Sequence, residues 1–463
     1  MAIVESFSGI RGIYGKEFTD SAAVKYAYSY CSFLRDKLKK RNPVIAVGLD
    51  TRPSGLKLKN IIMGILDCNF IDVGIAPTPA IEFAVRHFNA DGGIIITASH
   101  NEPEWNGFKF LSSDGSILKE NEMNLVINKY KTFNNFHKIQ ERKIHEKNED
   151  TIEKYSEFIL KIIGRGNIEK IKKSKQKIVI DPNGGTGAIA KKILEKAGAE
   201  VAAVNMECAK FKRLIEPNED SLKYLKNVID ESNADFAAGF DCDADRVEIL
   251  LNDGRLLSGN YILALIVYEM LSRSDNPQKQ VVVVNDATSN VVRDIAEKFG
   301  AKIKEVEVGE INVVEQMNKS KAIVGGEGSN GGVIIPPSKC RDGILTLLMV
   351  LSIVAENQKS LHEIIQEFPQ YYTLKKKMEF TSSKHDSIKK SIKNYYSGKC
   401  FEIKETGGLK GGLKVITGKN SFVWFRASKT ESNVFRMICD SQKKEESKAL
   451  MQEAVDVFND ANK

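Results

Sequence analysis

Residues 177–204 read KIVIDPNGGTGAIAKKILEKAGAEVAAV, and this stretch decides the fold. A β-branched apolar run ends at Asp181, and a Pro–Asn–Gly–Gly turn follows it. The spacing then predicts a helix over about 188–196 and a second apolar strand after Gly198. A strand–helix–strand unit of this kind predicts parallel strands joined by a crossover helix.

The same unit occurs twice more in the chain. Val44–Asp50 (VIAVGLD) and Val281–Asp286 (VVVVND) are also apolar runs that end in Asp, and a helix is expected over 289–298. Three copies predict an α/β protein with three similar mixed α/β domains of βαβ units. After about residue 368 β-rich runs with flanking helices predict a C-terminal α+β domain. The expected domains are 1–150, 151–252, 253–367 and 368–463.

Composition limits the classes of function. The chain has 463 residues, 42% hydrophobic and 28% charged, as expected of a globular protein of three or four domains. The net charge of +7 suits anionic small molecules and is too weak to predict a nucleic-acid partner. The longest apolar stretches, 261–271 and 344–355, are shorter than the ~20 residues that span a bilayer. We therefore expect no membrane partner.

The cysteines indicate the redox compartment. There are seven, an odd number, and no two have CxxC spacing. This argues against a disulfide framework or a zinc site and favours a reducing compartment. The first residues contain no apolar signal core. We expect a cytoplasmic protein, either a monomer or a homodimer.

Three polar loops follow predicted buried strands, over 92–98, 234–241 and 321–327. Ligands of open α/β sheets collect at the carboxyl ends of strands, so these loops form one candidate site. In the second loop, Asp241, Asp243 and Asp245 can converge on a hard cation such as Mg²⁺. An EF-hand is excluded because its Gly and Glu positions hold Arg246 and Asn252. The alternative is a polar turn that only ends a strand.

The other loops are individually less specific. Ser99, beside His100, can act as a nucleophile or phosphate carrier, or can belong to an ordinary turn. Glu327 and Ser329 suit sugar hydroxyls, although a glycine-rich turn explains them equally well. A guanidinium and two hydroxyls lie close together near the C-terminus, in Arg426, Ser428 and Thr430. These groups suit a phosphate dianion, and the alternative is a solvated hairpin.

One motif points elsewhere. Gly185, Gly187 and Ala190 fit the G-x-G-x-x-A dinucleotide fingerprint after a strand. Pro182 and Asn183 lengthen its turn, and no acidic residue ends a clear second strand near Asn205. A dinucleotide-dependent oxidoreductase is therefore a minor alternative.

Taken together, the motifs resemble those of the α-D-phosphohexomutase family, and the resemblance extends over essentially the whole chain. The matching segments are SGIRG at 8–12, TASHN at 97–101, NGFK at 106–109, DCDADR at 241–246, GEGS at 326–329 and RASKTE at 426–431. The resemblance implies four domains around a central cleft, with one loop from each domain.

The resemblance also implies the chemistry. Ser99 would carry a phosphoryl group and exchange it with a hexose monophosphate, through a hexose 1,6-bisphosphate that also serves as activator. Mg²⁺ would be held by the Ser99 phosphate and by Asp241, Asp243 and Asp245. Four residues would line the reaction centre, namely Arg11, His100, Lys109 and Arg246. Lys109 is the candidate general acid/base among them. Glu327 and Ser329 would bind sugar hydroxyls, while the other phosphate would be held by Arg426, Ser428 and Thr430.

The sugar is less defined. Glu310 follows Val308–Gly309, which resembles a second specificity loop, and its carboxylate would suit the ammonium of glucosamine phosphate. The most similar members are archaeal-type phosphoglucosamine mutases, while a phosphomannomutase or phosphoglucomutase remains open. The chain departs from the family pattern at Glu102, Gly331 and Lys429, and the departures at Glu102 and Lys429 leave open a weakly active phosphosugar-binding protein.

Overall fold

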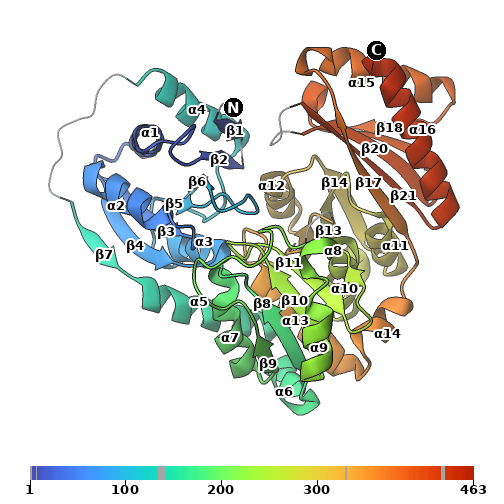
Figure 1. The fold of residues 1–463 in the computed structure, drawn as a ribbon, viewed down its shortest axis with the longest axis horizontal. Helices are drawn as coiled ribbons and strands as arrows, with labels where there is room; N and C mark the ends of the chain where they lie inside the picture. The colour runs from blue at the N-terminus through green and yellow to red at the C-terminus, as the bar shows by residue number, and fades with distance from the viewer. Residues whose placement is uncertain (1–2, 7, 134–141, 329–330, 429–432) are drawn as a thin grey trace. The chain divides into compact units, whose positions relative to one another are not determined.

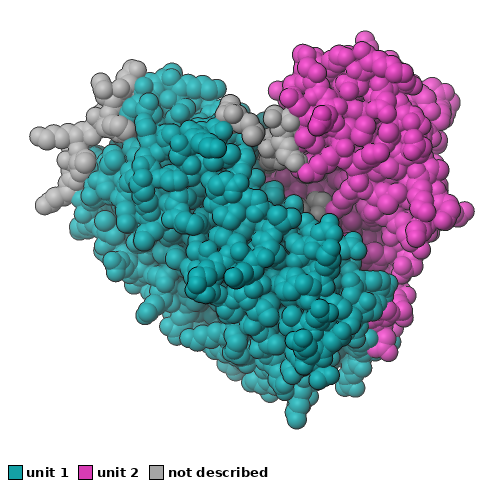
Figure 2. All heavy atoms as spheres, in the orientation of Figure 1, with its two compact units in different colours: residues 1–257, 332–361 teal, residues 258–331, 362–463 magenta. Residues whose placement is uncertain are grey.

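The computed structural model describes residues 3–6, 8–133, 142–328, 331–428 and 433–463 (Figure 1). The chain divides into two compact units, shown in two colours in Figure 2. The first contains residues 1–257 and 332–361, and the second contains residues 258–331 and 362–463.

The first unit begins with a seven-stranded sheet in the order β1-β2-β6-β5-β3-β4-β7. Its strands are β1 (Val4–Ser6), β2 (Gly9–Ile13), β3 (Val44–Leu49), β4 (Asn69–Ile75), β5 (Gly92–Ile96), β6 (Trp105–Leu111) and β7 (Ile144–Glu146). Strands β5, β3, β4 and β7 are parallel, whereas β2 and β6 are antiparallel to their neighbours. The helices are α1 (Asp20–Leu38), α2 (Gly55–Ile65), α3 (Thr78–His87) and α4 (Glu120–Lys131).

A second sheet in this unit has the order β12-β11-β10-β8-β9. Its strands are β8 (Lys177–Asp181), β9 (Glu200–Ala203), β10 (Phe236–Phe240), β11 (Val247–Leu251) and β12 (Leu256–Leu257). The helices are α5 (Asn148–Ile163), α6 (Arg165–Ser174), η1 (Thr186–Ile189), α7 (Ala190–Ala197), α8 (Glu219–Leu222) and α9 (Leu225–Ser232). The parallel trio β10, β8 and β9 confirms the βαβ unit predicted from residues 177–204.

A later segment completes this unit. It supplies β16 (Val333–Ile334) and α13 (Gly343–Asn357). Helix α13 is buried over most of its length and is anchored at Leu351, whose carbonyl accepts a 3.0 Å hydrogen bond from Gln176 Nε2. The apolar stretch at 344–355 is therefore a core helix. Within the described ranges, no helix combines the length and apolar character needed to cross a bilayer.

The second unit contains the third βαβ copy, in which β13 (Val281–Asn285) is parallel to both β14 (Lys302–Val306) and β15 (Val324–Gly326). Its helices are α10 (Gly259–Ser272), η2 (Pro277–Lys279), α11 (Asn290–Lys298) and α12 (Glu310–Ser320), and α14 (Leu361–Gln366) begins at the unit boundary. Ser289 caps α11 by accepting from the backbone N–H of Val291, as expected of a serine at this position.

The C-terminal part of this unit is the predicted α+β region. Its antiparallel sheet has the order β17-β21-β20-β19-β18. The strands are β17 (Tyr372–Glu379), β18 (Glu402–Glu405), β19 (Leu413–Gly418), β20 (Ser421–Ala427) and β21 (Val434–Ser441). The helices are η3 (Ser382–Lys384), α15 (His385–Gly398), η4 (Gly408–Lys410) and α16 (Lys444–Asn462).

One covalent feature differs from expectation. Cys31 of α1 and Cys68, just before β4, form a disulfide within the first core. The sequence argued against a disulfide framework, and this pair is an exception to that expectation. The two residues are 37 positions apart, and sequence spacing does not reveal which residues a sheet and helix bring together.

Candidate active site

Ser99 lies in the turn between β5 and β6 and is almost fully buried. Its backbone has φ +52°, a left-handed conformation that is uncommon outside glycine. The Ser99 N–H donates to Thr97 Oγ1 at 2.8 Å. The Ser99 hydroxyl donates to Asp241 Oδ2 at 3.2 Å, so the structure brings the two predicted loops together.

The acidic loop forms the turn between β10 and β11. One carboxylate oxygen from each of Asp241, Asp243 and Asp245 lies within 4.8 Å of the others. All three residues are buried, and Asp243 Oδ1 and Asp245 Oδ1 have no hydrogen-bond partner among the described residues. Three convergent carboxylates with unsatisfied oxygens fit a hard divalent cation such as Mg²⁺.

The charges of this loop influence one another. Burial raises the pKa of Asp241, and the neighbouring carboxylates Asp243 and Asp245 raise it further. Burial acts in the same direction on Asp245, but the cationic Arg341, Lys109 and Arg246 outweigh it and lower the Asp245 pKa. The loop thus contains one carboxyl that resists ionisation and one that is held ionised.

Two predicted cations lie directly on the acidic loop. Lys109 Nζ, from β6, is 2.7 Å from Asp243 Oδ2 and 3.0 Å from Asp245 Oδ2. Arg246 Nε is 3.9 Å from Asp241 Oδ2 and 3.8 Å from Asp245 Oδ1. These side chains partly neutralise the three carboxylates and explain how the cluster tolerates burial.

Arg11 and His100 complete the predicted set. Arg11 Nη1 is 3.3 Å from Asn101 Oδ1 and 3.5 Å from the Ala98 carbonyl oxygen, so it contacts the serine loop. Burial, together with the charge of Arg246, lowers the Arg11 pKa to about 10. Burial and the cations Arg246 and Arg11 lower the His100 pKa well below its usual value, so its imidazole is neutral at pH 7.

Two residues of this cluster were not predicted from sequence. Arg341 Nη2 is 3.0 Å from Asp245 Oδ2, and Thr78 Oγ1 donates to Asp243 Oδ2 at 2.6 Å. Thr78 starts a helix directly after a parallel strand, a signal that could have found it. Arg341 precedes the cap of an apolar helix and had no comparable signal.

Glu102, one of the departures from the family pattern, has a structural partner. Its carboxylate Oε1 accepts from the backbone N–H of Ile215 at 3.3 Å. The serine loop is thereby tied to the segment that precedes α8.

The predicted sugar and phosphate residues belong to the second unit. Glu327 follows β15, and its Oε1 accepts from Asn285 Nδ2 at 2.9 Å and from the Gly309 N–H at 2.8 Å. Glu310 is buried and begins α12. The bond from the Gly309 N–H connects Glu327 to the segment that contains Glu310. The two segments predicted to bind the sugar therefore lie side by side.

Arg426 lies near the end of β20, and its Nη2 is 3.1 Å from Glu307 Oε1. Burial lowers the Arg426 pKa, an effect that outweighs the opposing charges of Glu307, Asp286 and Glu327. The backbone N–H of Ser428 donates to the Val434 carbonyl at 2.7 Å. Ser329 and Thr430 lie outside the described residues.

The dinucleotide-like glycines have a different role. A side chain at Gly187 would meet the ring of Phe240 at 2.9 Å, and one at Gly185 would meet the Cys242 carbonyl oxygen at 2.8 Å. The N–H of Thr186 also donates to that carbonyl at 2.9 Å. These glycines allow close packing beneath the acidic loop, which removes the basis for a dinucleotide site.

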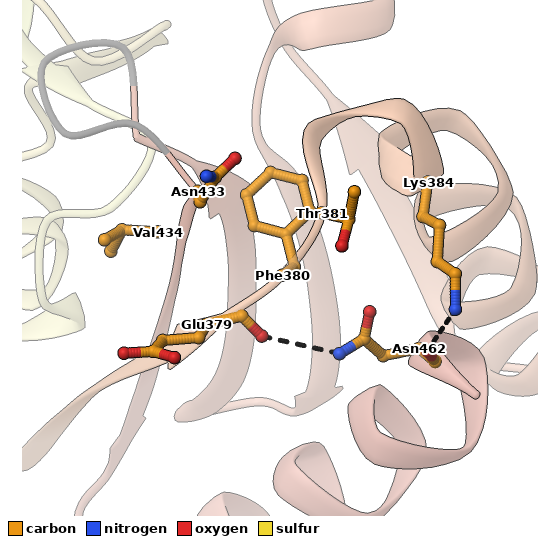
Figure 3. A pocket seen from close by; sticks show the side chains of 7 residues that line it. All are labelled: Glu379, Phe380, Thr381, Lys384, Asn433, Val434 and Asn462. Carbon is orange, nitrogen blue, oxygen red and sulfur yellow. Dashed lines mark hydrogen bonds between the residues drawn. The ribbon is translucent and has the colours of Figure 1, made fainter. Parts of the chain in front are cut away.

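A separate surface pocket of about 530 Å³ lies in the C-terminal α+β part (Figure 3). Asn462 Nδ2 donates to the Glu379 carbonyl at 3.4 Å across one side of it. Its lining residues are Glu379, Phe380, Thr381, Lys384, Asn433, Val434 and Asn462, and none is a predicted site residue.

Comparison with known proteins agrees with this geometry. Family descriptions of phosphoglucomutase/phosphomannomutase α/β/α domains I, II and III match residues 5–136, 153–254 and 258–372, respectively. A crystal structure of a phosphoglucomutase/phosphomannomutase family protein from Burkholderia thailandensis has a TM-score of 0.81 at 19% identity, covering 100% of this chain and 98% of that one. That likeness shows the four-domain fold.

Two curated relatives extend over nearly the whole chain. A phosphoglucomutase/phosphomannomutase of Thermococcus kodakarensis is 34% identical, covering 98% of both chains. A phosphoglucosamine/phosphogalactosamine mutase of Sulfurisphaera tokodaii is 29% identical, covering 94% of both. With its matching domains and relatives, this chain belongs to the phosphoglucomutase/phosphomannomutase family, the α-D-phosphohexomutases, and is an enzyme of the mutase class.

Proposed function

We propose that this enzyme interconverts hexose 6-phosphate and hexose 1-phosphate by way of a phosphorylated Ser99. The observation that carries the proposal is the 3.2 Å contact between the Ser99 hydroxyl and Asp241 of the acidic cluster. A hydroxyl at this position can carry a phosphoryl group beside a cation site. The four loops would come from domains at 1–150, 151–252, 253–367 and 368–463.

The reaction follows from the residues around Ser99. Phospho-Ser99 passes its phosphoryl group to the free hydroxyl of the hexose monophosphate, which forms a 1,6-bisphosphate. The bisphosphate turns around and returns its other phosphoryl group to Ser99. In this proposal Lys109 would exchange a proton with the reacting sugar hydroxyl, while Arg11, His100 and Arg246 would stabilise the transferring group.

Asp241, Asp243 and Asp245 would hold Mg²⁺ together with the phosphate of Ser99. Once bound, the metal supplies charge neutralisation for the phosphoryl group. A hexose 1,6-bisphosphate would act as activator because it can phosphorylate an empty Ser99.

Residues of the second unit would bind the rest of the substrate. Glu327 and Ser329 would bind sugar hydroxyls. The non-reacting phosphate would be held by Arg426, Ser428 and Thr430. A binding site for the distal phosphate lets one reaction centre accept the bisphosphate in both orientations.

The test of this function is phosphorylation of Ser99. After incubation with Mg²⁺ and glucose 1,6-bisphosphate, intact-protein mass spectrometry is expected to show one added phosphoryl group. Ser99→Ala is expected to remain unmodified and to lose mutase activity by at least about 10³-fold, because the group-transfer route is removed. Persistent turnover by Ser99→Ala contradicts the proposal. A wild-type protein that binds the sugar phosphate but is never phosphorylated supports a binding protein instead.

The preferred substrate is proposed to be glucosamine 6-phosphate. Support comes from the buried carboxylate Glu310, which adjoins the Gly309–Glu327 contact, and from the name of the Sulfurisphaera relative. Mutase assays on the 6-phosphates of glucosamine, mannose and glucose rank the substrates.

Glu310→Gln is expected to lower kcat/KM about tenfold for glucosamine 6-phosphate, because it removes a charge that faces an ammonium. Glucose 6-phosphate has no ammonium and serves as the matched control substrate. Equal losses on both sugars contradict this role of Glu310.

A further inference from the structure

Two arginines with largely buried side chains, Arg52 and Arg213, lie behind the two reactive loops of the first unit, and no motif had singled them out. Arg52 is 2% exposed and is among the largest fully buried side chains. Its Nε forms a 3.0 Å ion pair with Asp50, a residue at the end of β3.

The rest of the Arg52 guanidinium is bonded to the serine loop. Nη2 donates to the Ser99 carbonyl at 2.7 Å and to the Asn101 carbonyl. Nη1 donates to the carbonyls of Glu102 at 2.5 Å and Trp105 at 3.1 Å. One guanidinium therefore binds four carbonyl oxygens of the serine loop and the first residue of β6.

The partner of Arg52 reaches the same loop from the other side. Asp50 Oδ2 accepts from Thr97 Oγ1 at 2.6 Å, and Thr97 Oγ1 accepts from the Ser99 N–H. The peptide groups on both sides of Ser99 are thus fixed. This bonding stabilises a left-handed serine backbone, which costs about 1 kcal/mol or more.

Arg213 makes a related set of bonds in the second sheet, with one bond to the residue that precedes the acidic loop. Its Nε forms an ion pair with Asp181, at the end of β8, and its side chain is 5% exposed. Nη2 donates to the Phe240 carbonyl at 2.7 Å, immediately before Asp241 of the acidic loop. Nη1 donates to the Leu214 carbonyl at 2.9 Å.

The two arrangements occupy the same place in the repeated unit. Asp50 ends the apolar run of β3, which is parallel to β5 and the serine loop after it. Asp181 ends β8, which is parallel to β10 and the acidic loop after it. In both copies an Asp at a strand end pairs with an arginine that donates to the backbone of the neighbouring strand. Arg52 donates to four carbonyl oxygens around the serine loop, and Arg213 donates to the Phe240 carbonyl at the last residue before the acidic loop.

We propose that Arg52 and Arg213 are positioning residues, Arg52 for the phosphate-carrying serine and Arg213 for the carboxylates that hold the cation. The proposal rests on the proposed function of these loops. A planar guanidinium with five donors can bind several fixed carbonyls at once, whereas an ammonium is a point charge that cannot match this geometry. Displacement of a reacting group by about 1 Å costs on the order of 100-fold in rate.

Lysine substitutions test the two roles separately. Arg52→Lys is expected to slow Ser99 phosphorylation by glucose 1,6-bisphosphate about 100-fold, measured by intact-protein mass over time. Its kcat falls with little change in KM, and its Mg²⁺ affinity is unchanged. Arg213→Lys is expected to weaken Mg²⁺ binding about tenfold by isothermal titration calorimetry without substrate.

Arg35→Lys is the matched control. Arg35 also pairs with an aspartate, Asp67, and donates to the carbonyls of Asp67 and Arg41, outside both loops. The control is expected to change neither the phosphorylation rate nor Mg²⁺ affinity.

Thr97→Val and Tyr224→Phe are milder variants for use if a lysine variant does not fold. Thr97→Val removes the hydroxyl bonded to Ser99 N–H and Asp50, and Tyr224→Phe removes a 2.7 Å hydrogen bond to Asp181 Oδ2.

The outcomes separate this proposal from the proposed function. If the wild type is phosphorylated and Arg52→Lys reacts at the same rate, the role of Arg52 is wrong. Each variant can also lose both the phosphorylation rate and the Mg²⁺ affinity, to an extent that follows only the drop in its melting temperature. In that case the arginines are merely structural and the proposal is overturned. If the wild type itself is never phosphorylated at Ser99, the proposed function fails and the role of Arg52 fails with it, while the Mg²⁺ measurement still decides the role of Arg213.

Discussion

Asp342 is a fully buried carboxyl at the N-terminus of α13. Its two oxygens both lie 2.8 Å from the Tyr155 hydroxyl, and Oδ1 accepts from the Leu345 N–H. Burial raises the pKa of Asp342 to about 6, from an ordinary value of 3.8. The Asp342 carboxyl therefore stays protonated to a higher pH in the folded protein than in the unfolded chain.

The pH dependence of the folding stability follows from the direction of this pKa shift. Between about pH 4 and pH 6 the unfolded chain releases this proton before the folded protein does, so stability falls as pH rises through that window. Asp342→Asn cannot titrate but keeps an oxygen that can cap the helix. Relative to this variant, the wild type is expected to lose up to about 3 kcal/mol between pH 4 and pH 7.

Melting temperatures of both proteins across this pH range check the prediction. A constant difference between wild type and Asp342→Asn would mean that the carboxyl titrates normally.

Strand β14 and the residue after it carry two ion pairs to the C-terminal sheet within the second unit. Glu305 Oε1 is 2.5 Å from Lys414 Nζ, and Glu307 pairs with Arg426. Alternate positions of extended chain face the same side, which explains why residues two apart both bind cations of β19 and β20.

Only the second pair involves a predicted phosphate ligand. If Arg426 binds the substrate phosphate as proposed, Glu307 competes with that phosphate for the guanidinium. Glu307→Gln is therefore expected to lower KM for hexose 6-phosphate about 3- to 10-fold. Glu305→Gln removes the neighbouring carboxylate and is the matched control, with KM expected to be unchanged. A raised KM in Glu307→Gln would show that the carboxylate orients Arg426 rather than competing for it.

At the scale of helices and strands, the sequence correctly predicted the repeated strand–helix–strand units but missed an edge strand added to one of their sheets. The strands at Val44, Lys177 and Val281 lie where their apolar runs predicted. Strand β7 (Ile144–Glu146) was not predicted, because the segment is polar and exposed and joins β4 only as an edge strand. Edge strands lack the hydrophobic pattern on which such predictions depend.

The proposed cation site belongs to the whole first unit, since the two sheets of this unit supply the serine and acidic loops. A ligand that binds only the folded state at 100 times its Kd stabilises that state by about 2.7 kcal/mol. Mg²⁺ is therefore expected to raise the melting temperature of the wild type by a few degrees relative to EDTA. Asp243→Asn should lose most of this response, and an equal response in scanning calorimetry contradicts the assignment of the carboxylates to the metal.

The sequence by itself determined the fold class, the order of the motifs and most residues of the cluster around Ser99, because strand periodicity and loop chemistry are local properties. Only the tertiary structure decided that Ser99 lies against Asp241, that Lys109 bridges Asp243 and Asp245, and that Cys31 pairs with Cys68. It also revealed the buried cations behind the loops, including Arg52. A buried ionic side chain is stable only where distant backbone carbonyls and carboxylates converge on it, and that convergence is set by the packing of the sheets rather than by sequence neighbours.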